Sequence, residues 1–527
     1  MGTATKFPAS AGIESLAAAE TARHADVFLQ PRAGEDPCLM AGLLRIILER
    51  GWHDQAFCRD FVAGLEGLRA AVDPFTPDYV ARRADVPESD LLRAAETFAA
   101  DGKRGSAASG TGPNMAAHSN LAEHLIECLN VVCGRYARPG DPVPNPGVLS
   151  PRIPRRAEVI APGRSWMSSP ARSASGFGVL FGQKMTGALA DDIAADSPGK
   201  IRALFVDGGN PALALPNQNK IVGALKQLPL LVTIDPFMSA TARLSHYILP
   251  PKMMFERADL PSRDYESIIL FRPYSQYAAP LVPAPPGSEL VDDWYPFWAI
   301  AKRLGRQILY DGEPLNMEQA PLTTDLLAIL ARHAAIPLAE IQARDGGDIF
   351  AAEPQFVEPG EHNSRFDVMP DDVQRELQDY LGEGRAALGA QTPSTYRLIV
   401  RRMREVQNTM YHELPQIRRR VKQNPALLHP LELAALGLRD GDEITLVSAH
   451  GQIRTIVGAD DSLRRDVVSL THGWGGLPDD PSTDTAGACS NQLTSDAIRD
   501  PINAMPVFTG FSVRIEKRAP VDTGALS

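Results

Sequence analysis

The sequence predicts an α/β protein that ends in a separate β-rich domain. Three observations support this fold class. Residues 39–134 carry apolar side chains at helical spacing, residues 202–235 read as strand, helix and strand, and period-two alternation begins only after residue 441. A chain of 527 residues is too long for one hydrophobic core. We therefore expect three domains, over residues 1–140, 141–390 and 391–527.

The first region is predicted to be mainly helical. Leu39–Gly51 and Ser89–Gly102 each show an apolar stripe that ends at glycine, and Ser89 is a candidate N-cap. Residues 105–114 are small and suggest a short strand that runs into a glycine-rich turn. The strongly apolar segment 121–134 then predicts another helix, closed by Gly134.

The middle region contains the α/β unit. Residues 138–180 are rich in Pro, Arg and Ser and predict a long loop or crossover. Strands are expected at 202–207, 230–235 and 247–250, with a helix at 219–228. The first two strands are almost wholly apolar, which is typical of a parallel sheet covered on both faces. Residues 340–395 are polar and predict a linker or a mobile insertion.

The last region changes to a β pattern. Residues 429–437 predict a short helix with Pro430 at its start and Gly437 at its end. Residues 442–459 alternate apolar and polar about a turn at 449–451, which predicts a β-hairpin.

Composition limits the classes of partner. The net charge is −11, so no general basic excess exists to bind nucleic acid, and the basic runs 401–404 and 418–420 are interpreted as solvated faces. No stretch approaches the ~18–20 apolar residues of a membrane-spanning helix. The amino terminus shows no basic region followed by an apolar run, which predicts a cytoplasmic protein.

The first candidate site follows the strand at 202–207. Ligands of open parallel sheets bind beyond the carboxyl ends of the strands, and Gly209 would let the backbone approach a ligand closely. Asn210 could cap the next turn or bind a heterocycle. Asp235, at the end of the second strand, suits a ribose hydroxyl or a guanine edge. An ordinary structural turn is an equally open interpretation.

Other loops offer similar chemistry. Arg32, Gly34 and Asp36 precede a helix whose amide-rich start favours a phosphate, although Asp36 could be a simple N-cap. Residues 110–120 bring Gly110 and Gly112 before another helix, with a histidine that is more often structural than a ligand. In the β-rich domain, the segments 471–476 and 489–495 stand out, because a Gly-Trp-Gly loop can hold Trp474 as a stacking platform.

Neither the cysteines nor the known catalytic motifs point to catalytic residues in this sequence. The five cysteines form no Cys-x-x-Cys pair and are expected to be buried as small hydrophobic residues, so no metal ligand is predicted. The sequence contains no G-x-S-x-G, no P-loop, no H-E-x-x-H and no evident pair of catalytic carboxylates, which leaves the catalytic residues unknown.

Several segments together resemble the molybdopterin oxidoreductase family, which includes dimethyl sulfoxide reductase, formate dehydrogenase and periplasmic nitrate reductase. The resemblance covers nearly all of residues 19–517. It rests on "ETARHADVFLQPRAGEDP", "LFVDGGNPALALP" and "LVTIDPFMSATARLSHYILPP", and, farther on, on "LLHPLELAALGLRDGDEITLVSAHGQI", "VVSLTHGWGG", "SNQLTS" and "DPINAMP". It implies Rossmann-like parallel-sheet domains followed by a double-psi β-barrel. Residues 1–140 would then be the later part of a pterin-dinucleotide domain, 141–390 a second molybdopterin-binding domain and 391–527 the dinucleotide-binding barrel.

The resemblance also implies a cofactor, bis(molybdopterin guanine dinucleotide) with molybdenum or tungsten. By the matching positions, Gly34 and Asp36 would hold one guanosine, while Asn210 and Asp235 would serve the other nucleotide. The segment "RMREVQNTMYH" is similar to the part of formate dehydrogenases that lies beside the pterin. The barrel residues that would close over the pterins or lie beside them are Asn408, His412, His472, Trp474, Asn491 and Thr494.

One departure from the family is large. Family members begin with a cysteine cluster for an iron–sulfur centre, followed by the residue that ligates the metal, and neither is recognised here. We therefore expect a truncated chain or one half of a split enzyme, with a small-molecule substrate and an N-terminal iron–sulfur chain or electron-transfer subunit as partner. The alternative hypothesis is a non-catalytic nucleotide-binding or scaffold subunit.

Overall fold

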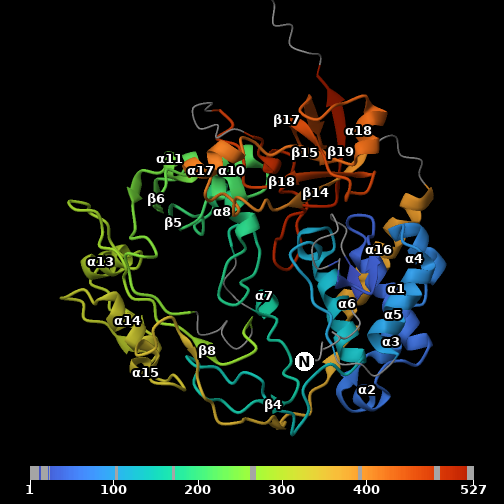
Figure 1. Ribbon diagram of the computed structural model, residues 1–527, viewed down its shortest axis with the longest axis horizontal. Helices are drawn as coiled ribbons and strands as arrows, with labels where there is room; N and C mark the ends of the chain where they lie inside the picture. Colours follow the sequence, from blue (N-terminus) through green and yellow to red (C-terminus); the bar gives the residue numbers. More distant parts are fainter. Residues whose placement is uncertain are drawn as a thin grey trace, which may run out of the picture.

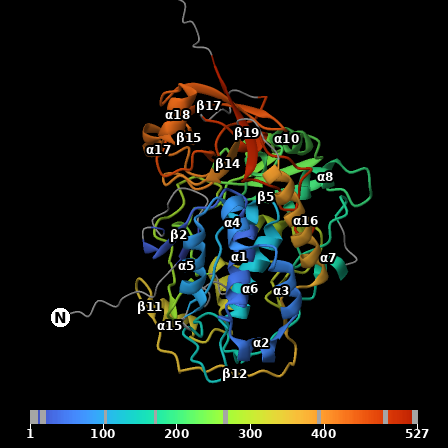
Figure 2. The same ribbon diagram turned by 90° about the vertical axis from the view of Figure 1, so that its right-hand side faces the viewer.

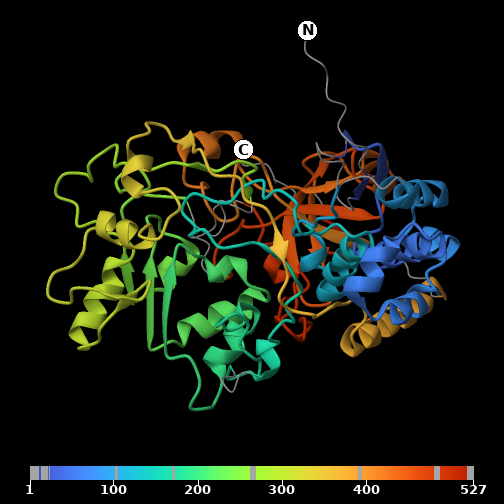
Figure 3. The same ribbon diagram turned by 90° about the horizontal axis from the view of Figure 1, so that it is seen from below.

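The computed structural model describes residues 11–13, 22, 24–100, 105–168, 173–261, 269–389, 395–479 and 487–518. They form three lobes (Figure 1): a helical first lobe, a middle lobe built on a parallel sheet, and a β-barrel that lies above the first lobe and beside the sheet of the middle lobe. Seen from below, the first and middle lobes lie on opposite sides with the barrel between them (Figure 3). The predicted α/β class with parallel sheets and a C-terminal barrel is confirmed.

The first lobe packs around α1, which is apolar on nearly all sides and is buried by its neighbours α3, α4, α5 and α6. The parallel strands β1 and β2 lie beside α5. The elements are β1 (Ala11–Ile13), β2 (Val27–Leu29), α1 (Asp36–Glu49), α2 (Gln55–Phe61), β3 (Val62–Ala63), α3 (Leu65–Val72), α4 (Pro77–Ala84), α5 (Glu88–Ala99), η2 (Pro113–Met115) and α6 (Ser119–Val132).

Three local expectations for this lobe are wrong. Residues 105–110 form no strand, because the backbone N–H and carbonyl of Ala107 bond to the side chain of Asn130 at 2.7 and 2.9 Å instead of to a neighbouring strand. Helix α5 begins at Glu88 with Pro87 as its N-cap, instead of at Ser89. The supposed linker 340–395 contains β13 (Phe366–Asp367), which pairs with β3, and α16 (Asp371–Gly389), whose Leu377 and Tyr380 enter the first core. Figure 2 shows α16 alongside α1 and α3.

The middle lobe carries the predicted strand–helix–strand unit. Strands β5 (Ala203–Asp207), β6 (Leu230–Ile234) and β7 (Tyr247–Leu249) form a parallel sheet in that order, with α10 (Gln218–Lys226) between the first two in the chain. The central strand β6 is buried, as expected. The expectation of full burial is wrong for β5, because it is an edge strand and exposes Ala203 and Asp207.

The remaining elements of the middle lobe are short. They are β4 (Arg156–Ala157), α7 (Ser165–Ser168), η3 (Thr186–Ala188), α8 (Leu189–Ala194), α9 (Pro211–Ala214), α11 (Ala240–Leu244), β8 (Tyr274–Ser275), α13 (Tyr295–Arg303), β9 (Leu309–Tyr310), β10 (Glu313–Pro314), α14 (Thr323–Leu330), α15 (Leu338–Gln342), β11 (Asp348–Ile349) and β12 (Glu358–Pro359). No helix among the described residues is long and apolar enough to cross a membrane.

The third lobe is a closed six-stranded barrel, ordered β14-β18-β15-β17-β16-β19. The predicted hairpin is confirmed, since Val447 pairs with Gln452 in antiparallel register. The predicted helix ends at Gly437, which has a left-handed φ of 60°. The elements are β14 (Tyr396–Arg401), α17 (Pro415–Arg420), β15 (Ala426–Leu428), α18 (Pro430–Leu436), β16 (Glu443–Val447), β17 (Gln452–Ala459), β18 (Val467–Thr471), η5 (Ser490–Gln492) and β19 (Phe511–Lys517). The predicted three-domain boundaries stay a prediction.

Hydrogen bonds join the barrel to the middle lobe. The fully buried side chain of Gln218, at the start of α10, donates to the carbonyl oxygens of Ala212 (3.1 Å) and Gly476 (2.9 Å). It also accepts a hydrogen bond from Gln492 of the barrel at 2.9 Å. Nearby, Lys220 pairs with Asp496. We call this contact the α10 seam.

Ion pairs join the barrel to the first lobe. Arg464 of the barrel pairs with Asp85 and donates to the backbone oxygen of Gln30 at 2.9 Å. Arg32, just after β2, lies 3.3 Å from Asp466 of the barrel. The barrel therefore fixes the position of both other lobes.

A buried arginine ties α16 to the rest of the first lobe. Arg83 is 5% exposed, and its Nε lies 2.7 Å from a carboxylate oxygen of Glu35. It also donates to the Tyr380 carbonyl oxygen at 3.0 Å and stacks over the Tyr380 ring. Arg83→Met should lower the free energy of opening of α16 by about 3–5 kcal/mol, because Glu35 loses its buried partner.

Hydrogen exchange of the α16 amides measures this effect. Arg82→Met is the matched control, since Arg82 is 64% exposed in its ion pair with Asp78 and such pairs contribute about 0–1 kcal/mol. Equal loss of α16 protection in both variants would contradict the assigned role of Arg83.

The α10 seam leads to a second prediction. Gln218→Leu keeps the side-chain volume but leaves buried carbonyl groups unpaired, at a cost of about 1–3 kcal/mol for each group. The backbone amides of residues 488–496 should then exchange their hydrogens faster. The same segment should be cleaved faster in limited proteolysis. Gln227→Leu, at the exposed end of α10, is the control and should leave this segment unchanged. If residues 488–496 of Gln218→Leu are protected from exchange and cleavage as well as in the wild type, Gln218 does not hold this segment in place.

Candidate functional site

Four of the predicted residues come together at one edge of the barrel. Strands β14 and β18 are parallel and Arg401 pairs with Thr471, so the loops that follow them leave the barrel side by side. His472 lies with Nδ1 3.1 Å from the carbonyl oxygen of Arg401 and with Nε2 2.9 Å from the side-chain oxygen of Asn408. Asn408 and His472, 64 residues apart in sequence, are therefore neighbours. We call Asn408, His412, His472 and Trp474 the barrel cluster.

The tautomer of His472 follows from its contacts. Nδ1 faces a carbonyl oxygen and must donate, so Nε2 of a neutral ring must accept. Burial lowers the pKa of His472, and the nearby Arg402 lowers it further, so the ring is neutral at pH 7. We infer that the Asn408 amide turns its nitrogen towards Nε2 and its oxygen away from the ring.

His412 and Trp474 form the buried half of the cluster. Their rings meet edge to face, with centroids 4.5 Å apart and planes at 88°. His412 is 6% exposed and Trp474 is 2% exposed, so both rings are buried, and the role of Trp474 as a stacking platform stays a prediction. Gly473, with φ of 82°, lets the loop pass so close to Asn408 that a Cβ would collide with the Asn408 carbonyl oxygen.

Two polar atoms of this pair are buried and make no hydrogen bond to the described part of the chain. Nδ1 of His412 and Nε1 of Trp474 are buried without a hydrogen bond among the described residues. Burial also lowers the pKa of His412, so that ring too is neutral at pH 7. Buried polar atoms of this kind are rare in native proteins and usually await a ligand or water. The barrel cluster thus offers uncharged hydrogen-bonding groups to a bound molecule.

The two strand ends of the middle lobe are neighbours, as predicted. Asp207 at the end of β5 pairs with Ile234 at the end of β6, which brings Gly209 and Asn210 close to Asp235. The side-chain oxygen of Asn210, however, accepts from the backbone N–H (3.2 Å) and the hydroxyl (2.9 Å) of Thr241. Asp235 accepts from the N–H of Phe237 at 2.9 Å. The structure thus supports the turn interpretation of Asn210 and leaves a ligand role untested.

Asn491 and Thr494 extend the α10 seam. Asn491 donates to the carbonyl oxygen of Leu213 at 2.7 Å, and the hydroxyl of Thr494 accepts from the N–H of Asn217 at 3.3 Å. Both side chains are at most 5% exposed. They join the barrel to the middle lobe and lie apart from the barrel cluster's hydrogen bonds.

The first-lobe loop 32–36 faces the barrel. Gly34 has φ of 86° and lies against Gly510 of the barrel, where a Cβ on Gly510 would be 3.5 Å from Gly34. Asp36 is the first residue of α1, and Glu35 is the N-cap, so the N-cap interpretation of Asp36 is wrong. Burial raises the pKa of Asp36 to about 6, its own backbone N–H lowers it in part, and the neighbouring Glu35 and Glu123 raise it further.

The loop that holds Gly110 and Gly112 is exposed, and a Cβ at either position would meet no atom within 4 Å. Met115, which follows this loop, contacts the barrel, because its carbonyl oxygen accepts hydrogen bonds from the N–H groups of Phe508 and Thr509. The histidine after it, His118, lies 3.1 Å from each of two glutamates on α16, which are Glu376 and Glu383. The structural interpretation of His118 is therefore confirmed.

Sequence reasoning missed Asn424, which holds two site loops together. Its fully buried amide donates to the carbonyl oxygens of Thr471 (2.7 Å) and Ala488 (2.9 Å) and accepts from the Ala488 N–H at 2.8 Å. In the sequence, the Asn424-Pro425 pair signals only an ordinary turn.

The expected burial of all five cysteines is confirmed, and each thiol is free. Burial raises the pKa of Cys489 to about 12 and thereby keeps it protonated. Among the described residues, no group of three or more His, Cys, Asp or Glu side chains could hold a metal ion.

The raised pKa of Asp36 predicts a pH-dependent effect of mutation. The folded-state pKa of about 6 exceeds the ordinary value of 3.8, so ionisation of Asp36 opposes folding. This penalty is absent below pH 4 and complete above pH 6. Asp36→Asn should therefore raise the melting temperature at pH 7–8, and the gain should vanish near pH 4.

Thermal melts of the cofactor-free chain across pH 4–8 measure this difference. Glu49→Gln, at the opposite end of α1, serves as the control and should show no such growth with pH. A melting temperature of Asp36→Asn that falls below wild type at pH 8 would contradict the desolvation argument.

Two known proteins illustrate what the chain is similar to. Acetylene hydratase from Syntrophotalea acetylenica is 23% identical over 526 residues, covering 91% of this chain and 68% of the relative. The F420-dependent formate dehydrogenase subunit alpha of Methanocaldococcus jannaschii is 22% identical over 301 residues, covering 56% of this chain and 42% of the relative. The matched region spans about one quarter to two thirds of the length of these and the other curated relatives.

A solved structure and two family descriptions agree with these relatives. The structure of acetylene hydratase from Pelobacter acetylenicus has a TM-score of 0.73 at 19% identity, covers 96% of this chain and 74% of that one, and shows the shared fold alone. The description "Molydopterin dinucleotide binding domain" matches residues 396–512, which include the barrel cluster. The description "Molybdopterin oxidoreductase" matches residues 6–279, just over half of the chain. The chain therefore belongs to the molybdopterin oxidoreductase family.

Proposed function

We propose that this chain holds bis(molybdopterin guanine dinucleotide) for a two-electron oxidoreductase. The observation that carries the proposal is the barrel cluster inside the matched dinucleotide-binding region. Nδ1 of His412 and Nε1 of Trp474 are buried there and have no hydrogen-bond partner among the residues that the structure describes. A pterin ring carries both donors and acceptors at its edge, so it could satisfy both atoms. When bound, the metal of such a cofactor would supply the redox chemistry.

The residues of the first and middle lobes fit the nucleotide ends. Asp36 carries a desolvated carboxylate, and a guanine edge offers the N–H donors that would stabilise its charge. Asp235 lies at the carboxyl end of the sheet, where nucleotides bind in open α/β folds. Gly34 keeps its loop free of a side chain next to the barrel.

The chain's own residues would bind and orient the cofactor. Nδ1 of His412 would hydrogen-bond to the pterin without adding charge, because burial lowers the pKa of this ring. Neutral His472, held by Arg401 and Asn408, would orient the Asn408 side chain. The buried position of Trp474 would keep water away from the pterin side of the site. We keep a small-molecule substrate of the formate type as part of the proposal, on the basis of the relative named as a formate dehydrogenase subunit.

Other parts of the hypothesis stay predictions. These are the choice between molybdenum and tungsten, the cytoplasmic location and an electron-transfer partner. The alternative, a non-catalytic nucleotide-binding or scaffold subunit, is less favoured, because the family description that covers residues 6–279 is that of an oxidoreductase.

Cofactor content tests the proposal directly. Protein made in a host that synthesises the cofactor should contain bound pterin, measured by the fluorescence of its oxidised form, and molybdenum or tungsten, measured by mass spectrometry. Asp36→Ala and Asp235→Ala should each weaken retention by about 1–3 kcal/mol, because a buried guanine edge would lose its partner. Trp474→Phe should also lower the pterin content, since it removes the N–H and keeps a ring.

Trp52→Phe is the matched control, because Trp52 packs against the first core, far from the barrel strands in the chain. Protein that carries guanine nucleotide but no pterin would support the scaffold alternative. Full pterin retention by all three site variants would refute the assignment of the site.

A further inference from the structure

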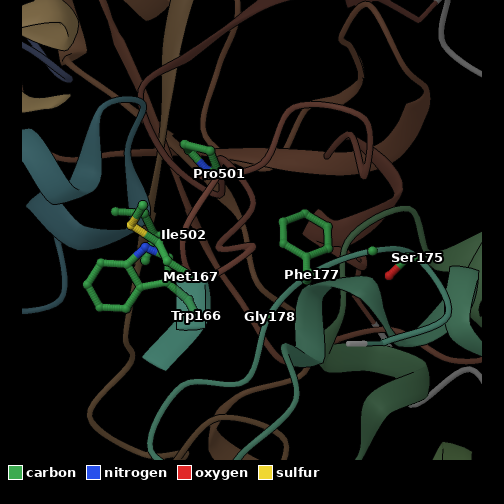
Figure 4. Close-up of a pocket in the computed structure, with 8 residues that line it drawn as sticks. Trp166, Met167, Ser175, Phe177, Gly178, Pro501 and Ile502 are labelled. Atoms are coloured by element: carbon green, nitrogen blue, oxygen red, sulfur yellow. The ribbon is translucent and has the colours of Figure 1, made fainter. Parts of the chain in front are cut away.

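A pocket lies outside the residues discussed above. It has a volume of about 560 Å³ and is formed where the segment around α7 meets the barrel loop after Arg499. Figure 4 shows Trp166, Met167 and Ile502 gathered on one side, with Phe177 on the other. The lining residues are Trp166, Met167, Ser175, Gly176, Phe177, Gly178, Pro501 and Ile502. Its volume falls in the usual range of ligand pockets, about 300–1,000 Å³.

The wall that carries Phe177 is held in place by hydrogen bonds. The N–H and hydroxyl of Ser175 both donate to the buried carboxylate of Asp192 at 2.7 Å. Ser173 accepts from the N–H of Phe177 at 3.1 Å. Gly178 lies so close to the carbonyl oxygen of Trp166 that a Cβ there would overlap it. The two aromatic walls are thus fixed relative to each other before any ligand binds, which lowers the entropy cost of binding.

The chemistry of the lining selects against charge. None of the eight lining residues is ionisable, and the Ser175 hydroxyl is already donating to Asp192. Arg499 lies 5.3 Å from the centre of the Phe177 ring, and Asp191 holds its guanidinium at 2.6 Å. Among the described lining residues, a small anion would find no ionic partner to replace the water that it loses, which is costly. A neutral molecule with an apolar ring would instead bury its surface against aromatic side chains.

The pocket is connected to the candidate cofactor loops. Asp500, next to Pro501, accepts a hydrogen bond from Asn120 at 2.7 Å. Asn120 is the second residue of α6 and follows the loop of Gly110 and Gly112. The loop that closes the pocket is therefore anchored beside a segment of the proposed cofactor site.

We propose that this pocket binds a neutral, ring-bearing apolar molecule, and that it does so in preference to a small carboxylate such as formate. The inference goes beyond the proposed function, because the formate-type substrate proposed above is a small carboxylate and the ligand of this pocket is a second, different molecule. Binding itself requires no cofactor, so the pocket and the cofactor site can fail separately.

Two probes that share one ring system test the pocket. 2-Naphthol is neutral at pH 7, whereas 2-naphthoate carries a carboxylate. Binding to the purified chain is measured by saturation-transfer NMR and calorimetry, with pterin content recorded for each sample. 2-Naphthol should bind at least about tenfold more tightly than 2-naphthoate, because only the neutral ring escapes a charge-desolvation cost.

Variants locate the binding. Ile502→Asp places a charge in the pocket and should weaken 2-naphthol binding about tenfold or more. Ile498→Asp is the matched control, because Ile498 is 58% exposed in the same loop and does not line the pocket. Phe177→Leu removes an aromatic wall without adding charge and should weaken binding as well, which guards against misfolding of the aspartate variant.

Three results would overturn the proposal. They are equal or tighter binding of 2-naphthoate, no detectable binding of 2-naphthol, and equal effects of the Ile498 and Ile502 changes. Binding of 2-naphthol by a chain that never retains pterin would support the pocket while refuting the cofactor proposal.

Discussion

The contact between the barrel and the other two lobes is the constraint on which the candidate site depends. The first and middle lobes have separate hydrophobic cores, and two barrel residues, Leu477 and Cys489, pack into the core of the middle lobe. Gln218 in the α10 seam and Arg464 on the opposite side fix the barrel's position. Because the candidate loops come from all three lobes, a shift of the barrel would separate the groups that could surround one ligand.

Several side chains at these loops lower the stability of the folded chain. Asp36 is a carboxylate whose ionisation opposes folding, and His412 and Trp474 each bury a polar atom that finds no partner in the described part of the chain. Natural proteins retain such defects mainly where function needs them. A ligand that satisfies these atoms would also stabilise the folded chain, since it binds only the folded state.

The pocket between α7 and the barrel loop has the opposite character. Its polar groups are satisfied within the protein, as the hydrogen bonds of Ser175 to Asp192 show, and its walls are apolar. A site of this type discriminates by excluding charge and by shape rather than by hydrogen bonding. The cofactor loops and the pocket would therefore bind two different kinds of molecule, a charged dinucleotide cofactor and a neutral apolar ligand.

The sequence by itself determined the elements with strong local signals. The strands β5 and β6, helix α10 and the hairpin of β16 and β17 follow from apolar periodicity and turn residues, and the motif order indicated the family. Only the tertiary structure decided that α16 joins the first core, that Trp474 is buried against His412, and that Asn424 ties two loops together. These features depend on contacts between residues far apart in the chain, and local sequence patterns carry no record of such contacts.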